Sequence, residues 1–497
     1  MADSPGSTGL SVQVGAAATS TAVGGMLVPL VLAQFLCSFA ATTMNVAISS
    51  IATDLGTTVS GVQTAITAFT LTMAALMIPG SKLTDIWGRK LCFRLGLVVY
   101  GVGALIAAVS QGLPTLILGY SLGQGIGTAL LIPPVYILAT VFYADMKARA
   151  RAFGAISAAG GIGSAAGPLI GGLITSAATW RLAFGVQALL VLVILYLARR
   201  IADPGVQGHK PKFDFLGAVL SAAGLFFVVV GILQAGTYGW FRASRDFVVG
   251  STVLIPVGGI SPVWLFVLIG VLLLAGFFWH IAAAERAGKE PLLATRMFKN
   301  RVSNLGLVTQ NIQWLVLLGL SFVVSVYLQT VRGYGAIQTG LILTPATIGI
   351  LASSIAAGRL AQRRAQATLI RAGFVVSIIG VGLMLLLVPG STSVLTFVPG
   401  LLLVGLGVGV MLTSSVNVVQ SSFPEQDQGE ISGLSRSVSN LGSSLGVAIA
   451  GTVIVSDLVA GNAGYALALV VLMVFAIIGL IAAILLPATP PTETAAA

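Results

Sequence analysis

Charged residues are scarce in this chain, and their scarcity restricts its class. Only 8% of the 497 residues are Asp, Glu, Lys or Arg, while 57% are hydrophobic. Soluble domains carry about 25% charged residues, because polar groups must cover their surface. We therefore exclude a soluble enzyme, a disordered scaffold and a disulfide-stapled secreted module. The apolar runs are continuous rather than alternating, so we predict an all-α polytopic membrane protein.

Cysteine is almost absent as well. Cys37 and Cys92 lie in or beside different apolar runs, so they provide neither a metal site nor a disulfide framework. The chain also lacks the G-x-x-x-x-G-K-[ST] segment that binds ATP phosphates. We expect no metal, no cofactor and no enzymatic activity.

Fourteen apolar runs are long enough to cross a bilayer, which takes about 20 helical residues each. Thirteen contain no charged residue, and the other contains only Arg436. The runs lie near 27–51, 62–80, 95–111, 114–137, 153–176, 182–198, 215–235, 261–282, 302–329, 337–357, 372–388, 394–417, 431–456 and 460–487. Residues 247–260 are too short and too rich in Gly and Pro, so we expect a re-entrant or interfacial segment there.

Basic residues concentrate in alternate connections between the runs. With the N-terminus inside, the inner connections hold twenty Lys and Arg residues and the outer ones four. This asymmetry predicts that both termini are cytosolic. It also explains the net charge of +11, so we expect no nucleic acid partner.

A faint internal repeat divides the chain. A small residue, a basic residue and Leu precede a polar position at 81–84 and again at 358–362, where Ala361 stands before the polar Gln362. We predict a flexible tail over 1–26, six-helix bundles over 27–200 and 302–487, a linker with two extra helices over 201–301, and a tail over 488–497. Parallel halves around a central cavity are typical of alternating-access transporters.

The inner loop after the second run combines an acid, a glycine turn and two cations, at Asp85, Gly88, Arg89 and Lys90. Asp85 is able to accept hydrogen bonds from Arg89 or from the N-terminus of a helix. We interpret the loop as a gating latch. The alternative is a solvated basic loop that only determines topology.

The fifth run carries a stripe of small residues. Gly163, Gly167 and Gly171 recur every fourth residue, with Pro168 and Gly172 beside them. Such a stripe permits close helix packing, and a proline inside it removes a backbone hydrogen bond. We interpret the stripe as a hinge, with plain helix packing as the alternative.

Carboxylates are missing from the middle of the apolar runs. All fourteen acids lie at run ends, in loops or in tails, although a proton-coupled carrier needs a group whose pKa changes inside the bundle. The candidates for coupling are Asp54, Glu430 and Asp457, if water reaches them.

Neutral polar side chains must then line the cavity, because intramembrane amides usually face the bundle interior. The candidates are Gln34, Asn45, Gln63, Thr67, Gln124, Gln310, Asn311, Gln313, Trp314, Asn417 and Asn440. Interhelical bonding is the alternative for each. Arg436 either pairs with Glu430 or reaches toward the membrane surface. Otherwise it binds anionic groups of a substrate or replaces a missing cationic element.

The chain resembles the fourteen-span drug:proton antiporters of the major facilitator superfamily over residues 27–487. The residues that carry the resemblance are the Asp85–Lys90 loop, the Gly163–Gly172 stripe, Thr42, Asn45-Val46-Ala47, Gln124-Gly125-Ile126-Gly127, Glu290-Pro291-Leu292 and Tyr327-Leu328-Gln329 with Gly333. The resemblance implies two six-helix bundles that rock about a central cavity, with two added central helices, and export in exchange for protons.

The sequence departs from that family at functional positions. Ala40 replaces the usual acid of the first span, and Ser121 replaces the usual arginine of the fourth. Ser81 and Ile86 also replace a usual glycine and a usual basic residue in the loop. The first two departures put proton coupling in doubt, because those groups are thought to carry or tune the coupling proton.

We predict a monomeric secondary transporter of the inner or plasma membrane, surrounded by lipid, that exports small hydrophobic or amphipathic compounds. The acid-free interior favours neutral, zwitterionic or weakly anionic substrates over lipophilic cations. Protons are the expected coupling partner. The alternatives are a proton-independent facilitator of a neutral or anionic solute and a membrane receptor that transports nothing.

Overall fold

The computed structural model describes residues 16–143, 146–201, 212–249, 252–360, 364–388, 391–424, 427–455 and 463–487. Within them, fourteen helices are long and apolar enough to cross a membrane, which confirms the predicted fold class. Asp457 and the tail over 488–497 lie outside the described residues.

The first half of the chain supplies six spans. Its elements are α1 (Ala16–Val46), α2 (Ile48–Asp54), α3 (Val59–Trp87), α4 (Arg89–Ala108), α5 (Leu113–Leu116), the π-helix η1 (Ile117–Gln124), α6 (Gly125–Phe142), α7 (Met146–Ala177), α8 (Trp180–Leu197) and the short 3-10 helix η2 (Ala198–Arg200). The fourth span, Leu113–Ala139, is built from α5, η1 and α6 together.

The linker and the second half supply the other eight spans. The linker contains α9 (Phe215–Tyr238), β1 (Phe247–Val249), β2 (Thr252–Ile255), α10 (Pro262–Arg286) and the 3-10 helix η3 (Thr295–Phe298). The second half contains α11 (Arg301–Val326), the π-helix η4 (Tyr327–Val331), α12 (Ala336–Leu360), α13 (Gln366–Leu387), the 3-10 helix η5 (Val394–Thr396), α14 (Phe397–Ser421), α15 (Gln428–Val455) and α16 (Ala463–Leu485).

Local sequence determines where several helices begin. A short polar side chain at each N-cap accepts a hydrogen bond from a backbone N–H of the first turn, which would otherwise lack a partner. These residues are Thr58, Thr179, Asp214, Ser261 and Asn300. Between α3 and α4 the chain turns at Gly88 with a φ of 98°, a conformation that residues with a side chain rarely adopt.

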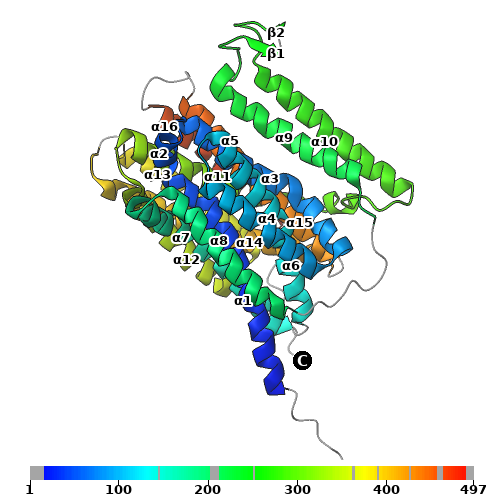
Figure 1. Ribbon diagram of the computed structural model, residues 1–497. Coiled ribbons are helices and arrows are strands. Elements are labelled where there is room, and N and C mark those ends of the chain that lie inside the picture. The colour runs from blue at the N-terminus through cyan, green and yellow to red at the C-terminus, as the bar shows by residue number, and fades with distance from the viewer. Residues whose placement is uncertain are drawn as a thin grey trace, which may run out of the picture.

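The two halves pack side by side, and the linker helices stand on one flank (Figure 1). Helix α9 contacts both α3 of the first half and α15 of the second. We call the end of the bundle where α3 ends and α4 begins the inner end, which the charge asymmetry predicts to be cytosolic, and the opposite end the outer end.

Two sequence predictions need correction here. Strands β1 and β2 pair antiparallel and project past the ends of α9 and α10 (Figure 1). The re-entrant alternative is therefore wrong, and the interfacial one stays a prediction. Both strands are rich in β-branched residues, which favour extended backbone. Helix α1 begins at Ala16, inside the tail predicted over 1–26, because an alanine-rich segment extends the first span.

Candidate functional site

A central cavity of about 70 Å³ lies between the two halves. Helices α1, α3, α6 and α7 of the first half and α11 and α15 of the second line it. The lining residues are Gln34, Cys37, Ser38, Ala41, Thr42, Thr70, Met73, Met77, Thr128, Ile132, Ser164, Trp314, Leu318, Arg436, Ser439, Asn440 and Ser443. Pockets that bind drug-sized ligands measure about 300–1,000 Å³. The cavity must therefore widen before such a ligand enters it.

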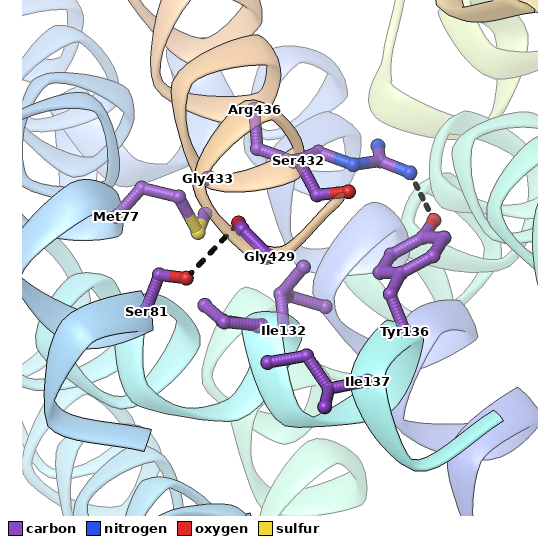
Figure 2. A pocket seen from close by; sticks show the side chains of 10 residues that line it. Met77, Ser81, Ile132, Tyr136, Ile137, Gly429, Ser432, Gly433 and Arg436 are labelled. Carbon is purple, nitrogen blue, oxygen red and sulfur yellow. Dashed lines mark hydrogen bonds between the residues drawn. The ribbon is translucent and has the colours of Figure 1, made fainter. Parts of the chain in front are cut away.

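Arg436 is the charged residue of this lining. Its guanidinium donates a hydrogen bond to the Tyr136 hydroxyl and lies 4.7 Å from the centroid of that ring. Figure 2 shows this pair reaching across from α15 to α6. Pairing of Arg436 with Glu430 is therefore wrong in this conformation, and the Glu430 carboxylate instead accepts a hydrogen bond from Ala294 N at 3.3 Å.

The Arg436 pair continues into the first half as a hydrogen-bonded chain. The Tyr136 hydroxyl donates to Gln34 Oε1 at 3.2 Å, and Gln34 Nε2 donates to Ser38 Oγ at 3.1 Å. Both Tyr136 and Gln34 are buried. These hydrogen bonds fix the guanidinium at the boundary between the central cavity and a smaller cavity toward the inner end. Arg436 and Tyr136 both line the smaller cavity (Figure 2).

A polar stripe on α15 extends outward from Arg436. Ser439, Asn440 and Ser443 follow at spacings of three, four and seven residues, so they share one face of the helix. The two serines donate to carbonyls of their own helix. The Asn440 side chain has no hydrogen-bond partner among the described residues, which leaves an amide available in the cavity.

Hydrogen bonds between the halves close the cavity at the outer end. Gln329 of η4 accepts from Ser49 N and donates to Asn45 O, each at 2.9 Å. Ser176 of α7 accepts from Ile337 N of α12 at 3.1 Å. We call these contacts the outer closure.

The seam between α3 and α15 is also closed, along its whole length. At its outer part, Gln63 Nε2 donates to Val447 O and Ala448 O at 3.2 Å. Toward the inner end, Ser81 Oγ donates to Gly429 O at 3.3 Å (Figure 2). Small residues allow this close approach, since a side chain at Gly433 would crowd Ser81. The structure thus has no outward-open pathway along this seam.

The glycine stripe of α7 packs on two different partners. Gly163, Gly167 and Gly171 lie against α1, where any added Cβ would strike Phe35, Thr42 or Thr43. This face matches the packing alternative. On the other face, Gly172 lies against the Ala336 carbonyl of α12, and Gly340 of α12 lies against the Pro168 carbonyl. Helix α7 continues unbroken through Pro168, and the hinge remains a prediction.

Most predicted cavity amides bond to neighbouring helices instead. Gln310 accepts from Ser435, Asn311 donates to Val438 O, and Gln313 accepts from Ser415. Trp314 alone of this cluster lines the cavity, because successive residues of a helix point in different directions. The interhelical alternative accounts for the three amides.

Three further candidates also lie outside the cavity. Gln124 donates to Gln187 within the first half at 2.9 Å. Asn45 and Gln63 belong to the closed outer part of the interface between the halves. Gln34 and Asn440 are the predicted amides that do line the cavity. Tyr136 and the serines of α15 were missed, although Tyr136 is a polar aromatic inside an apolar run.

Asp85 and Arg89 of the predicted latch are not bonded to each other in the described part of the chain. Asp85 is half-buried near Lys82, Arg89 and Glu430, but its carboxylate makes no hydrogen bond or ion pair within the described part of the chain. Gly88 supplies the turn that brings Arg89 to the first position of α4. The latch therefore stays a prediction about another state.

The coupling candidates that the structure describes do not reach the cavity. Asp54 pairs with Arg181 and accepts from Trp180 Nε1 at 3.0 Å, at the outer end of the first half. Glu430 lies at the inner end, where it contacts the linker. The described residues that line the cavity include no carboxylate.

Comparison with known proteins gives a consistent result. Residues 30–447 match the Major Facilitator Superfamily. The puromycin resistance protein pur8 of Streptomyces alboniger is 30% identical over 86% of this chain and 81% of its own length. The probable actinorhodin transporter of Streptomyces coelicolor is 29% identical over 83% and 69%. The cephamycin export protein CmcT of Amycolatopsis lactamdurans is 28% identical over 88% and 85%.

Proposed function

Because this chain belongs to the major facilitator superfamily, we propose that it exports drug-like amphipathic compounds by alternating access. The relatives named above are resistance, transport and export proteins. In this proposal the chain acts as a monomer in the inner or plasma membrane, and lipid covers its apolar outer faces. The cavity between the halves is the substrate site.

The observation that carries the proposal is a small cavity shared by both halves and closed at its outer end. Neutral hydrogen bonds make the outer closure, and each contributes only about 0.5–1.5 kcal/mol. A rocking movement of the halves is able to break them and to widen the cavity. The Asp85 loop would then latch the inner end, while α7 slides over α12 at Gly172 and Gly340.

The source of energy has two candidates. The resemblance to drug:proton antiporters predicts proton exchange. The lining without carboxylates favours a proton-independent facilitator, since no titratable acid faces the described cavity. Substrate-driven pH change inside proteoliposomes separates the two: an antiporter moves protons when substrate moves, and a facilitator does not.

Alternating access is tested by cross-linking the outer closure. In a variant without the native cysteines, Ser176→Cys and Ile337→Cys place thiols on α7 and α12 where the two helices touch. Oxidation of the pair should stop efflux from proteoliposomes, and reduction should restore it. Each single variant is the control. Efflux that continues through the oxidised pair, with the cross-link verified by mass, would rule out the mechanism.

A further inference from the structure

We propose that the cavity takes an amphipathic anion and that Arg436 binds its acidic group. This inference names the substrate class of the proposed function, and its binding test is independent of transport. The anionic group would be a carboxylate, sulfonate or phenolate, and the rest of the ligand would be a flat apolar, aromatic group.

Charge is the first argument. Arg436 is the charged residue among the described lining, and none of the described lining residues is Asp or Glu. A cationic ligand would therefore meet a like charge with no compensating carboxylate, which is costly away from water. An anion would instead give the guanidinium the partner that a partly buried cation requires.

The geometry of the guanidinium is the second argument. Arginine has five N–H donors in a planar fork that matches a carboxylate. In the described structure Arg436 makes one hydrogen bond, to the Tyr136 hydroxyl. That hydroxyl is itself fixed by its bond to Gln34. Arg436 is therefore held in place while it keeps donors for a ligand.

The remaining walls match the rest of such a molecule. Trp314, Leu318, Met73, Met77 and Ile132 supply an apolar and partly aromatic surface. Methionine and tryptophan adapt well to flat apolar ligands. The hydroxyl and amide groups of the α15 stripe follow outward from Arg436. A ligand would thus place its acidic end toward the inner end of the protein and its apolar body toward the outer end.

Export of an anion has an energetic consequence. The interior of a cell is electrically negative, so outward movement of one negative charge is favoured by about fiftyfold in concentration ratio per 100 mV. The membrane potential then contributes to export even where no carboxylate in the cavity carries a proton. An antiporter lacking the usual acid at position 40 would gain most from this contribution.

Three probes with one body and different charges test the inference: 1-pyrenebutyrate, 1-pyrenebutanol and a pyrenebutyl trimethylammonium salt. Binding is measured by energy transfer from tryptophan to pyrene, with the full chain in nanodiscs of neutral phosphatidylcholine. We expect the butyrate to bind about tenfold more tightly than the alcohol, a difference of about 1.4 kcal/mol, and the cation to bind most weakly.

Variants then assign the preference to one side chain. Arg436→Gln should erase the preference for the butyrate and leave the affinity for the alcohol nearly unchanged, while Arg436→Lys should retain part of it. Arg332→Gln is the matched control, because Arg332 also lies over a tyrosine ring, at 5.6 Å, but outside the cavity. This control should keep the full preference.

Two results would overturn the inference. One is a wild-type protein that binds all three probes alike or prefers the cation, a measurement that requires no variant to fold. The other is an Arg436→Gln protein that loses affinity for all three probes equally, which would indicate a structural role. Failure of transport with an intact butyrate preference would contradict the proposed function and leave this inference standing.

Discussion

Gln329 holds the outer end closed, so its removal should expose the cavity to the outside. The side chain is buried and bridges η4 to the break between α1 and α2 through Ser49 N and Asn45 O, each at 2.9 Å. In Gln329→Ala both bonds are lost. Two neutral hydrogen bonds are together worth about 1–3 kcal/mol. The population of the outward-open state should therefore rise by about five- to 150-fold.

The native thiol of Cys37 reports this change, because it lines the cavity and is only 6% exposed. In a Cys92→Ala background, a membrane-impermeant maleimide added from outside should label Cys37 faster in Gln329→Ala by the same factor. Gln338→Ala is the matched control: Gln338 lies at the same end, but its side chain accepts a hydrogen bond from Gly335 of its own half.

The reasoning fails if outside labelling of Cys37 is equally slow in Gln329→Ala and in the parent. It also fails if Gln338→Ala accelerates labelling as much, because the effect would then reflect general loosening of the outer end. Thermal unfolding of both variants shows whether either has lost overall stability.

Three other changes give distinct outcomes. Gly340→Ala should push α12 away from a carbonyl of α7 and accelerate outside labelling of Cys37, whereas Gly382→Ala, which has nothing within 4 Å of the added Cβ, should change nothing. Asp54→Asn breaks a partly exposed ion pair worth at most about 1 kcal/mol. The melting temperature should therefore fall slightly, while efflux and the proton signal stay unaltered. Loss of the proton signal would instead place proton coupling at Asp54. Asp85→Asn should weaken the inner latch, so that labelling of Cys37 from the inner side becomes about fivefold faster. Unchanged labelling would show that Asp85 is not part of the gate.

The spans could be predicted because bilayer crossing depends on a local sum of hydropathy. Each of the fourteen predicted runs overlaps one of the described spans. The β-hairpin after α9 was not predicted, because a short apolar run in the sequence is equally compatible with a strand and with a segment inside the bilayer. The π-helices η1 and η4 were missed as well, since nothing in their residue types separates them from ordinary helix.

The cavity was harder to predict, because an amide gives the same sequence signal whether it faces a cavity or a neighbouring helix. Gln313 and Trp314 are adjacent in sequence, yet Gln313 contacts Ser415 and Trp314 lines the cavity. The direction of each side chain depends on which helix packs on which face, and this is decided by tertiary contacts. Arg436 stood out in the sequence because a lone charge in a span requires a partner. That the partner is Tyr136 depends on how the two halves meet, which the sequence does not show.

The linker shows how the inserted helices relate to the two halves. After α10 the chain is attached to the second half: Arg296 pairs with Asp427 at 2.6 Å, and Ala294 N donates to Glu430. Within the bilayer region, Val229 of α9 packs in one cluster with Leu71 of α3 and Ala448 of α15. Among the described residues, the linker therefore contacts the first half through apolar side chains, whereas its contact with the second half includes an ion pair and a hydrogen bond. Because apolar surfaces slide at lower cost than hydrogen bonds break, a rocking movement of the halves should shear α9 against α3 while the inserted pair moves with α15.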